Sequence, residues 1–293
     1  MEHLEKLKDF TIHGTYQLPM QIYYQNYPSG GLTVPYHGHK EIELIYVESG
    51  SMEMTVNMNS FTAFAGDFFC INSGELHQIY SEGTQSSLHH ACVFSPDILN
   101  FEYWDEAQNQ YIHPLLTGQL LLPGHIQPNS SCYHDVISVF KKMLKLNNER
   151  SDGWYMEFKG CLYQLLGIMI RYHLLIQNTD EHPEENRKIE QCKKILGFIH
   201  SHYTEKIYLN DLAQVININP QYFCRFFKNI FHMTPVEYIN HYRISQSIKM
   251  LQSGSRSILE ICLDCGFESP SYFVKLFKKE TGFTPAEYRK RFH

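Results

Sequence analysis

The strongest constraint on the fold is an internal duplication in the last hundred residues of this 293-residue chain. Residues 209–242 align with residues 258–292, first at an offset of 49 residues and, after one inserted residue, at 50. Prolines, paired aromatic residues and a Thr-Pro pair recur at matching positions in both copies. A match of this kind indicates one helical unit that occurs twice.

Capping residues mark where the helices of each copy begin. Asn219-Pro220 and Ser269-Pro270 each place an N-cap residue before a proline at the first helical position. Three capping boxes combine Ser or Thr with Glu three residues later: Thr234 with Glu237, Ser257 with Glu260, and Thr284 with Glu287. Each copy therefore predicts a short helix, a turn and a second helix, and a helix from Pro235 to about Gln252 joins the copies.

The second helix of each copy has one apolar face and one polar face. We expect Phe223, Phe226, Phe227 and Ile230 in the first copy, and Phe273, Leu276 and Phe277 in the second, to be buried. A short helix, a tight turn and a basic second helix are typical of a helix-turn-helix, whose second helix enters the DNA major groove. The residues expected to contact DNA are Gln221, Tyr222, Arg225, Lys228, Ser271, Tyr272, Lys275 and Lys278. A solvated basic face on an ordinary helical repeat is the alternative.

The second copy resembles a known signature. Cys265-Gly266-Phe267, Ser271-Tyr272-Phe273, Phe277 to Glu280 and Thr284-Pro285-x-x-Tyr288 resemble the signature of AraC/XylS-type transcription regulators, and the resemblance extends over about 188–293. It implies two helix-turn-helix units on one linker helix, which enter successive major grooves about 34–36 Å apart. It also implies promoter DNA and RNA polymerase as partners.

Two residues depart from that family pattern. Tyr208 stands where a Ser or Thr cap is usual, and Cys224 stands where a polar residue that contacts bases is expected. Gln221 and Arg225 are therefore the better candidates for base contacts, because a Gln or Arg side chain can make two hydrogen bonds to the edge of one base. The lysines are expected to contact phosphate.

The net charge of −6 argues, taken alone, against a nucleic-acid partner. Residues 1–187, however, hold 10 Lys and Arg against 22 Asp and Glu, a net charge of −12, whereas residues 188–293 hold 15 against 9, a net charge of +6. The charge changes sign at a polar segment with a central proline, 177–187, which reads as a linker. Only the basic part is expected to meet DNA.

Residues 32–95 show the sequence pattern of short β-strands. Apolar or alternating runs at 42–47, 51–57, 68–71 and 87–94, separated by glycines, predict a small sandwich or barrel. Residues 1–31 read as a polar and aromatic arm that ends in a turn. The fold class is therefore α+β multidomain, with an N-terminal β-barrel and a helical pair, and a C-terminal all-α domain with two helix-turn-helix units.

A cluster of histidines and a carboxylate suggests a site inside that barrel. His37, His39 and Glu43 keep one parity along a strand, so their side chains point to one side, and His77 comes from another strand. The pattern resembles the two motifs of the cupin barrel, whose metal ligands are His, His, Glu and His, although Asn72 and Ser81 depart from it. Tyr36, Glu41, Tyr46 and Trp104 are candidate walls, and at most one of His89 and His90 faces inward.

Three interpretations of His37, His39, Glu43 and His77 remain open. In the first, they line an effector pocket without metal, as AraC-like regulators carry a cupin-like domain that binds a small effector, often a sugar. In the second, the four residues hold a divalent transition metal. No other cofactor is expected, and the metal itself is not required. In the third, they are satisfied histidines without a ligand. A metal-dependent cupin enzyme that carries a DNA-binding domain is the alternative function.

The remaining predictions concern domains and compartment. Helical periodicity begins near Asp135, and a second apolar helix runs from about Trp154 to Ile176, so residues 132–176 are expected to form a helical pair that makes a homodimer or covers the barrel. The domains are thus 1–131, 132–176, 177–187 and 188–293. Without a signal or membrane-spanning segment, and with scattered cysteines, we expect a cytoplasmic, bacterial, nucleoid-associated regulator with reduced thiols and no catalytic role. Cys262-x-x-Cys265 is expected to pack in a core.

Overall fold

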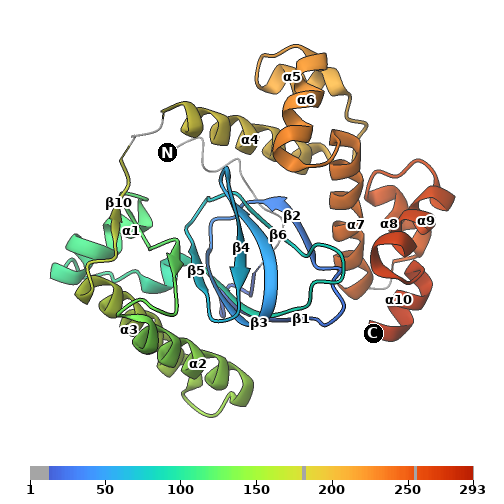
Figure 1. Cartoon of the computed structure of the whole chain (residues 1–293). Coiled ribbons are helices and arrows are strands. Elements are labelled where there is room, and N and C mark those ends of the chain that lie inside the picture. Colours follow the sequence, from blue (N-terminus) through green and yellow to red (C-terminus); the bar gives the residue numbers. More distant parts are fainter. Residues whose placement is uncertain (1–12, 180–182, 254–255, 293) are drawn as a thin grey trace. The chain divides into compact units, whose positions relative to one another are not determined.

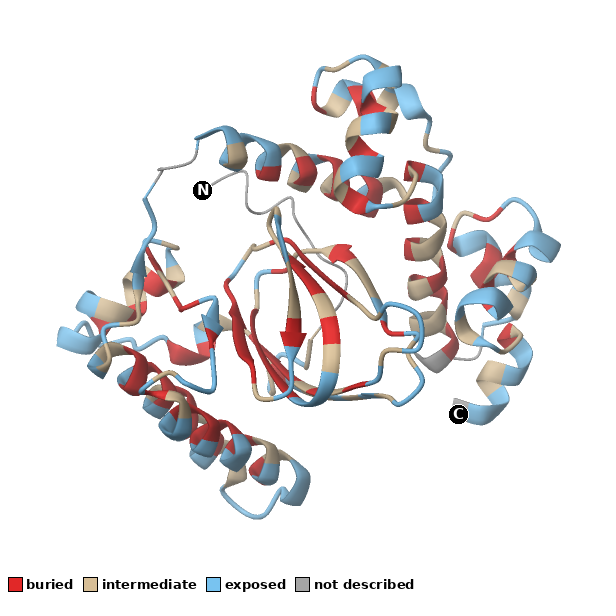
Figure 2. Ribbon diagram, viewed as in Figure 1, coloured by how far each residue is buried: buried red, intermediate tan, exposed pale blue. Residues whose placement is uncertain are grey.

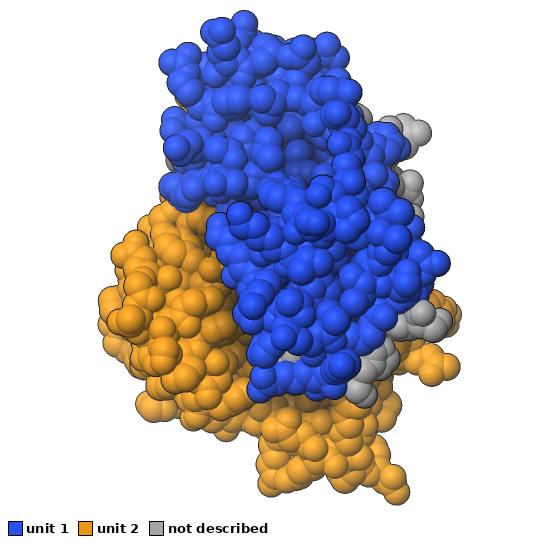
Figure 3. Space-filling view, turned by 90° about the vertical axis from the view of Figure 1, so that its right-hand side faces the viewer, with its two compact units in different colours: residues 1–8, 190–293 blue, residues 9–189 orange. Residues whose placement is uncertain are grey.

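A computed structural model defines residues 13–179, 183–253 and 256–292. Strands fill the first part of the chain and helices dominate the second (Figure 1). Buried residues run along most of the strands and along one side of most helices (Figure 2). The described residues form two compact units that divide between Ile189 and Glu190 (Figure 3), and each unit is a body of its own.

Eight strands of the first unit, among the described residues, form one antiparallel sheet that curves into a barrel (Figure 1). They are β1 (Met20–Tyr27), β2 (Thr33–His37), β3 (Ile42–Val56), β4 (Asn59–Phe64), β5 (Phe68–Ile71), β6 (His77–Tyr80), β7 (Ser87–Phe94) and β9 (His125–Ile126). β3 pairs with β5 and β7 through its first half and with β4 and β6 through its second half. The long β3 therefore joins both sides of the barrel.

The bend of β3 lies at a break in its register with β7, between Val47 and Ser49. Gly50 follows the break with a φ of +75°, and a Cβ atom there would lie 2.0 Å from the carbonyl oxygen of Ser86. Only glycine meets both conditions, since other residues rarely adopt a positive φ and need space for Cβ. The two strands predicted at 42–47 and 51–57 are thus one bent strand.

The prediction of a polar arm over residues 1–31 was wrong for β1. Met20–Tyr27 pairs along its whole length with β7, from Met20 opposite Phe94 to Tyr27 opposite Ser87. Glutamine and asparagine within this segment weaken the sequence signal for a strand. Pairing with a distant strand decides the conformation instead. Residues 1–12 lie outside the described part of the chain.

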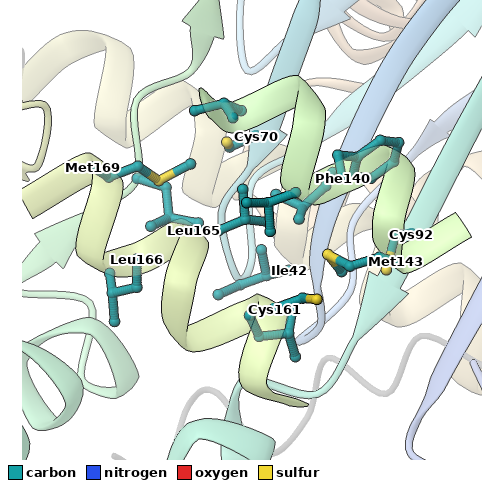
Figure 4. Packing of buried hydrophobic residues seen from close by; sticks show 14 of the residues in the cluster. Ile42, Cys70, Cys92, Phe140, Met143, Cys161, Leu165, Leu166 and Met169 are labelled. Carbon is teal, nitrogen blue, oxygen red and sulfur yellow. The ribbon is translucent and has the colours of Figure 1, made fainter. Parts of the chain in front are cut away.

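Two cores lie on the two faces of the sheet. Inside the barrel pack Leu32, Ile45, Val47, Met52, Met54, Ala63, Phe69, Ile71, Ile79 and Ala91. On the outer face, α2 (Tyr133–Glu149) and α3 (Trp154–Arg171) pack against alternate residues of β3, β5 and β7. Figure 4 shows Phe140 and Met143 of α2 beside Ile42, Cys70 and Cys92 of the strands. The helical pair therefore covers the barrel, whatever else it contacts.

Short elements connect the barrel to the helices. They are η2 (Pro96–Leu99), the π-helix η3 (Gln108–Ile112), α1 (His113–Leu116), β8 (Leu120–Leu121) and β10 (Ile176–Gln177), which pairs with β8. The second helix of the pair ends at Arg171 rather than near Ile176, and His173 then takes a φ of +53°, outside the helical range.

The linker predicted at 177–187 is wrong at both ends. Gln177 belongs to β10, and α4 (Pro183–His202) begins inside the predicted segment. Pro183 suits the first turn of a helix, where its missing N–H is not needed, and Glu184 and Glu185 favour the positive helix N-terminus. Residues 180–182 lie outside the described part of the chain.

The second unit is helical and repeats one motif. After α4 come α5 (Leu209–Val215) and α6 (Pro220–Phe231), then α7 (Pro235–Ser253), then α8 (Ile258–Asp264) and α9 (Pro270–Thr281), and finally α10 (Pro285–Phe292). The helices α6, α7, α9 and α10 begin at the four prolines that the capping signals indicated. The predicted α+β architecture, with a cupin-like barrel and a helical domain with two helix-turn-helix units, is confirmed.

Candidate functional site

Each helix-turn-helix is fixed by side chains that cap its second helix. The Oδ1 atom of Asn219 accepts a hydrogen bond from the backbone N–H of Gln221 at 2.8 Å, and Ser269 Oγ accepts one from Tyr272 N–H at 3.3 Å. These bonds satisfy amide groups that a helix start leaves without a partner. The capped ends set the position of the residues that follow.

All three predicted capping boxes form. The carboxylates of Glu237, Glu260 and Glu287 accept hydrogen bonds from the backbone N–H of Thr234, Ser257 and Thr284 at 2.7–2.8 Å. These backbone hydrogen bonds lower the pKa of all three glutamates. At α5, where Tyr208 has no capping hydroxyl of the Ser or Thr kind, the carboxylate of Asp211 accepts from the backbone N–H of Tyr208 at 3.1 Å.

The two faces of α6 and α9 follow the predicted division. Phe223, Phe227, Phe273 and Phe277 are fully buried. All eight residues predicted to contact DNA are exposed: Gln221, Tyr222, Arg225, Lys228, Ser271, Tyr272, Lys275 and Lys278. Phe226, Ile230 and Leu276 are only half-buried, because they flank the central phenylalanine stripe. Each recognition helix thus presents an outward row at the spacing i, i+1, i+4, i+7.

Sequence reasoning missed the contacts that join the two motifs. Asn240 of α7 donates a side-chain hydrogen bond to the hydroxyl of Tyr272 on α9 at 3.1 Å. Arg243, one turn further along α7, donates to the carbonyl oxygens of Tyr203 and Glu205 at 2.8 and 2.7 Å. Asn240, Arg243 and Tyr272 border a hollow of about 540 Å³ between α7, residues 204–207 and the turn from α8 to α9. Sequence offers no signal for them because the partners are 32 to 40 residues apart.

The predicted cluster in the barrel does form. One ring nitrogen of each of His37, His39 and His77 lies within 4.8 Å of those of the other two. Glu43 joins them, with Oε2 at 3.3 Å from His39 Nε2 and at 3.1 Å from His77 Nε2. His39, Glu43 and His77 are buried, and His37 is half-buried. The predicted convergence is correct, but the predicted single strand is wrong, because His37 ends β2, His39 lies in the connection that follows, and Glu43 belongs to β3.

Each imidazole of the cluster also forms a hydrogen bond through Nδ1 to a backbone carbonyl oxygen. The Nδ1 atom of His37 lies 2.9 Å from the carbonyl oxygen of Pro35, that of His39 lies 3.0 Å from Glu41 O, and that of His77 lies 3.1 Å from Glu75 O. A carbonyl oxygen only accepts hydrogen bonds, so each Nδ1 carries the proton. In the neutral rings, each Nε2 therefore keeps a lone pair.

Electrostatics inside the cluster are strongly perturbed. Burial, with the neighbouring histidines, lowers the pKa of His37 well below its ordinary value, so this ring is neutral near pH 7. Burial alone would raise the pKa of Glu43, but hydrogen bonds from His39 and His77 outweigh it and hold that pKa well below its usual range. The site thus combines an ionised carboxylate with imidazoles that cannot all be charged.

The residues predicted to line the pocket beside the cluster lie in different places. Tyr46 packs on the outer core, and Trp104 is 59% exposed and lies against His113, so neither lines the barrel interior. Tyr36 is buried and Glu41 half-buried. Of the neighbouring pair on β7, His89 is buried, whereas His90 is half-buried and lies 2.7 Å from Glu48. His13, which sequence reasoning missed, places its ring 5.0 Å from that of His39.

The Cys262-x-x-Cys265 pair packs in the core of the second motif, as predicted. Both thiols are buried among Ile244, Leu251, Phe273 and Phe277. Burial raises the pKa of both thiols, to about 12 at Cys265, so neither is a ready thiolate for metal or redox chemistry.

Comparison with known proteins gives two family matches. Residues 212–291 match the model of a helix-turn-helix domain, and residues 23–94 match that of a cupin domain. The chain is 27% identical over 292 residues to the HTH-type transcriptional regulator YdeC of Bacillus subtilis, which covers 98% of this chain and 97% of that protein. It is 23% identical over 257 residues to the melibiose operon regulatory protein of Escherichia coli, over 87% of this chain and 83% of that protein.

Among solved structures, apo ToxT from Vibrio cholerae aligns with 96% of this chain and 100% of its own, at 15% identity and a TM-score of 0.49. None of the helices formed by the described residues combines the length and the apolar character that crossing a bilayer requires.

The capped, duplicated helix-turn-helix unit and the cupin domain define a DNA-binding transcription regulator with an effector-binding domain. Within that class, the chain belongs to the AraC/XylS family, as the motifs of residues 258–288 indicated.

Proposed function

We propose that the protein binds promoter DNA at a specific sequence, and that a small effector bound in the barrel, a sugar or related carbohydrate, controls this binding or the activation that follows. The observation that carries the proposal is the pair of outward rows on α6 and α9, each behind a capped helix start. The name of the melibiose operon regulatory protein supports a sugar as effector.

In this proposal the exposed residues divide by chemistry. Gln221 and Arg225 contact base edges, because an amide or guanidinium group can make two hydrogen bonds to one base. Lys228, Lys275 and Lys278 contact phosphate, and Tyr222, Ser271 and Tyr272 position the helix starts on the backbone. A second copy of the chain, joined through residues 132–176, and RNA polymerase are the proposed protein partners. Because promoter DNA is the ligand, we place the protein in the bacterial cytoplasm, on the nucleoid when bound.

We further propose that His37, His39, Glu43 and His77 hold a divalent transition metal ion beside the effector. The geometry supports this, because the Nε2 atoms of His39 and His77 lie 3.3 and 3.1 Å from the same carboxylate oxygen of Glu43. With the proton of a neutral ring on Nδ1, the Nε2 lone pair faces this oxygen, and a bound cation would take the place of the hydrogen bond between them. Three nitrogens and one oxygen, with each ring anchored through Nδ1, are a donor set that Zn, Fe, Ni or Mn accepts.

DNA binding is tested with the full-length protein and genomic fragments that it selects. We expect one recurrent sequence with two half-sites one helical turn apart, and a change in affinity when a neutral sugar is added. Binding that is indifferent to sequence would refute specific recognition. A selected fragment whose affinity responds to none of the sugars would refute effector control.

The metal is tested by elemental analysis of protein purified without chelator. We expect about one transition-metal ion per chain, and its loss in the variant His37→Ala/His77→Ala, while His125→Ala, another barrel histidine outside the cluster, retains it. Protein that is free of metal refutes both the metal proposal and the alternative of a metal-dependent cupin enzyme. The names of the relatives, which are transcription regulators, favour regulation over catalysis.

A further inference from the structure

Two polar side chains inside the barrel stand apart from the histidine cluster. Ser87 and His89 of β7 are each only 2% exposed. Ser87 Oγ and His89 Nδ1 have no hydrogen-bond partner among the described residues. Buried polar atoms are nearly always hydrogen-bonded, and leaving one without a partner costs about 1–3 kcal/mol. Two such atoms two residues apart on one strand indicate a place that is built for a ligand.

Register shows that both side chains face the barrel interior. His89 lies opposite Val47 of β3, which is fully buried in the inner core, and directly opposite residues share a face. Ser87 lies opposite Tyr27 of β1, whose ring packs on the same core. Glu43 acts electrostatically on His89, so this wall and the cluster share one interior.

The neighbouring polar groups do not satisfy these two atoms. Gln25 and Tyr27 of β1 lie directly opposite His89 and Ser87, but they bind each other, with the Tyr27 hydroxyl donating to Gln25 Oε1 at 3.0 Å. The pairing leaves Ser87 and His89 available. Burial lowers the pKa of His89 to about 4, so its ring is neutral near pH 7 and offers both a donor and an acceptor.

The charge of the surrounding chain restricts the ligand. Residues 9–140 contain a single Lys or Arg, Lys40, and it is exposed. Residues 13–95 contain seven Asp and Glu. A carboxylate or phosphate ligand would meet this negative field without an Arg or Lys partner, and apart from the metal proposed at the cluster nothing would neutralise it. An apolar ligand would leave both polar atoms unsatisfied.

We propose that Ser87 and His89 form a hydrogen-bonding subsite for the hydroxyl groups of the effector, and that the effector is an uncharged polyhydroxy compound rather than a sugar acid or sugar phosphate. This inference rests on the proposed function, because it names the chemistry of the effector in the same barrel. A hydroxyl group both donates and accepts, which matches Ser87 and a neutral imidazole.

The test is calorimetric titration of the full-length protein with a matched panel. Galactose, glucose, arabinose and melibiose represent neutral sugars, and galacturonate, glucuronate and galactose 1-phosphate represent the anions. We expect a neutral sugar to bind the wild-type protein and no anion to bind more tightly. Ser87→Ala is expected to weaken that sugar about three- to tenfold, as loss of one neutral hydrogen bond does, and His89→Ala by at least as much.

The chain offers a matched control beside each residue. Ser86→Ala changes an exposed serine, and His90→Ala changes the histidine that faces away from the inner core, so both variants are expected to bind like the wild type. Loss of sugar binding in Ser87→Ala would not result from unfolding, because removal of a buried hydroxyl without a partner is not expected to lower the melting temperature of the free protein.

The failures are distinguishable. Tighter binding of an anion, or a neutral sugar whose affinity is the same in Ser87→Ala and His89→Ala, overturns the subsite while effector control stands. A panel in which no compound binds overturns the sugar effector, and the subsite with it. DNA binding to the selected fragment is measured separately and reports on recognition alone.

Discussion

The side-chain amide of Asn240 on α7 donates a hydrogen bond to the hydroxyl of Tyr272 on α9, with 3.1 Å between the two atoms. Tyr272 is among the residues proposed to contact DNA, and α7 is the helix that joins the two motifs. Arg243 adds to this junction by binding the carbonyl oxygens of residues 203 and 205 from the same helix, with its guanidinium over the ring of Phe267. The angle between the recognition helices is therefore set by side chains as well as by the length of α7.

A double-mutant cycle of Asn240→Ala and Tyr272→Phe measures this coupling. We expect each variant to lower the free energy of unfolding of the second unit, and the pair to interact by about 0.5–1.5 kcal/mol. Asn240→Ala is also expected to weaken binding to DNA with both half-sites more than to a single half-site. Additive losses of stability, or equal losses on both DNAs, would show that the bond does not position α9.

Arg225→Ala and Lys278→Ala are expected to weaken DNA binding in different ways. Loss of a base contact at Arg225 should cost about 1–3 kcal/mol on the selected sequence and relax specificity at one base position. Loss of a phosphate contact at Lys278 should weaken all sequences alike and reduce the salt slope by about 1. Lys194→Ala, an exposed lysine on α4, is the charge-matched control. Equal salt slopes and unchanged specificity in both variants would contradict these roles.

The sequence predicted the helical unit better than the barrel because helix boundaries are local. Asn219 and Ser269 accept hydrogen bonds from amides two or three residues away, so a few neighbouring residues suffice to predict where α6 and α9 begin. β1 depends on pairing with β7, whose residues lie 60 to 74 positions further along the chain, and the glutamines of β1 weaken its strand signal.

The same contrast holds at the sites. The spacing of His37, His39 and Glu43 indicated that they converge, although the parity of a single strand was the wrong reason, because a connection over residues 38–41 separates β2 from β3. Spacing could not show that Gln25 and Tyr27 bind each other and leave Ser87 and His89 without partners, since that choice depends on side-chain geometry across two strands. The contact between Asn240 and Tyr272 likewise follows from packing.

Gly50→Ala is expected to destabilise the barrel much more than Gly83→Ala. Both glycines have a positive φ, which costs roughly 1–2 kcal/mol for a residue with Cβ. Only at Gly50 would that Cβ also meet backbone, 2.0 Å from Ser86 O, whereas nothing lies within 4 Å at Gly83. Urea unfolding followed by tryptophan fluorescence reports on this unit, since Trp104 and Trp154 are the only tryptophans of the chain. Equal losses at both positions would contradict the close approach of β3 to β7.

His200 makes the second unit sensitive to acid. This histidine of α4 is 5% exposed, lies 3.1 Å from the Tyr238 hydroxyl and stacks on Tyr242. Burial, with Lys249 nearby, lowers its pKa to about 3. The unfolded chain, with an ordinary histidine pKa near 6.5, therefore binds a proton that the folded unit does not, and stability falls as the pH drops from about 6.5 towards 3.

Between pH 7 and pH 5 this one group is expected to remove about 2 kcal/mol from the free energy of unfolding. Hydrogen exchange of amides in α4 and α7 of the full-length protein measures it, because both tryptophans lie in the other unit. In His200→Gln, which keeps a polar side chain beside Tyr238 but does not titrate, the dependence on pH should be shallower by about one proton over this range. A slope that His200→Gln leaves unchanged would mean that other groups carry the acid sensitivity.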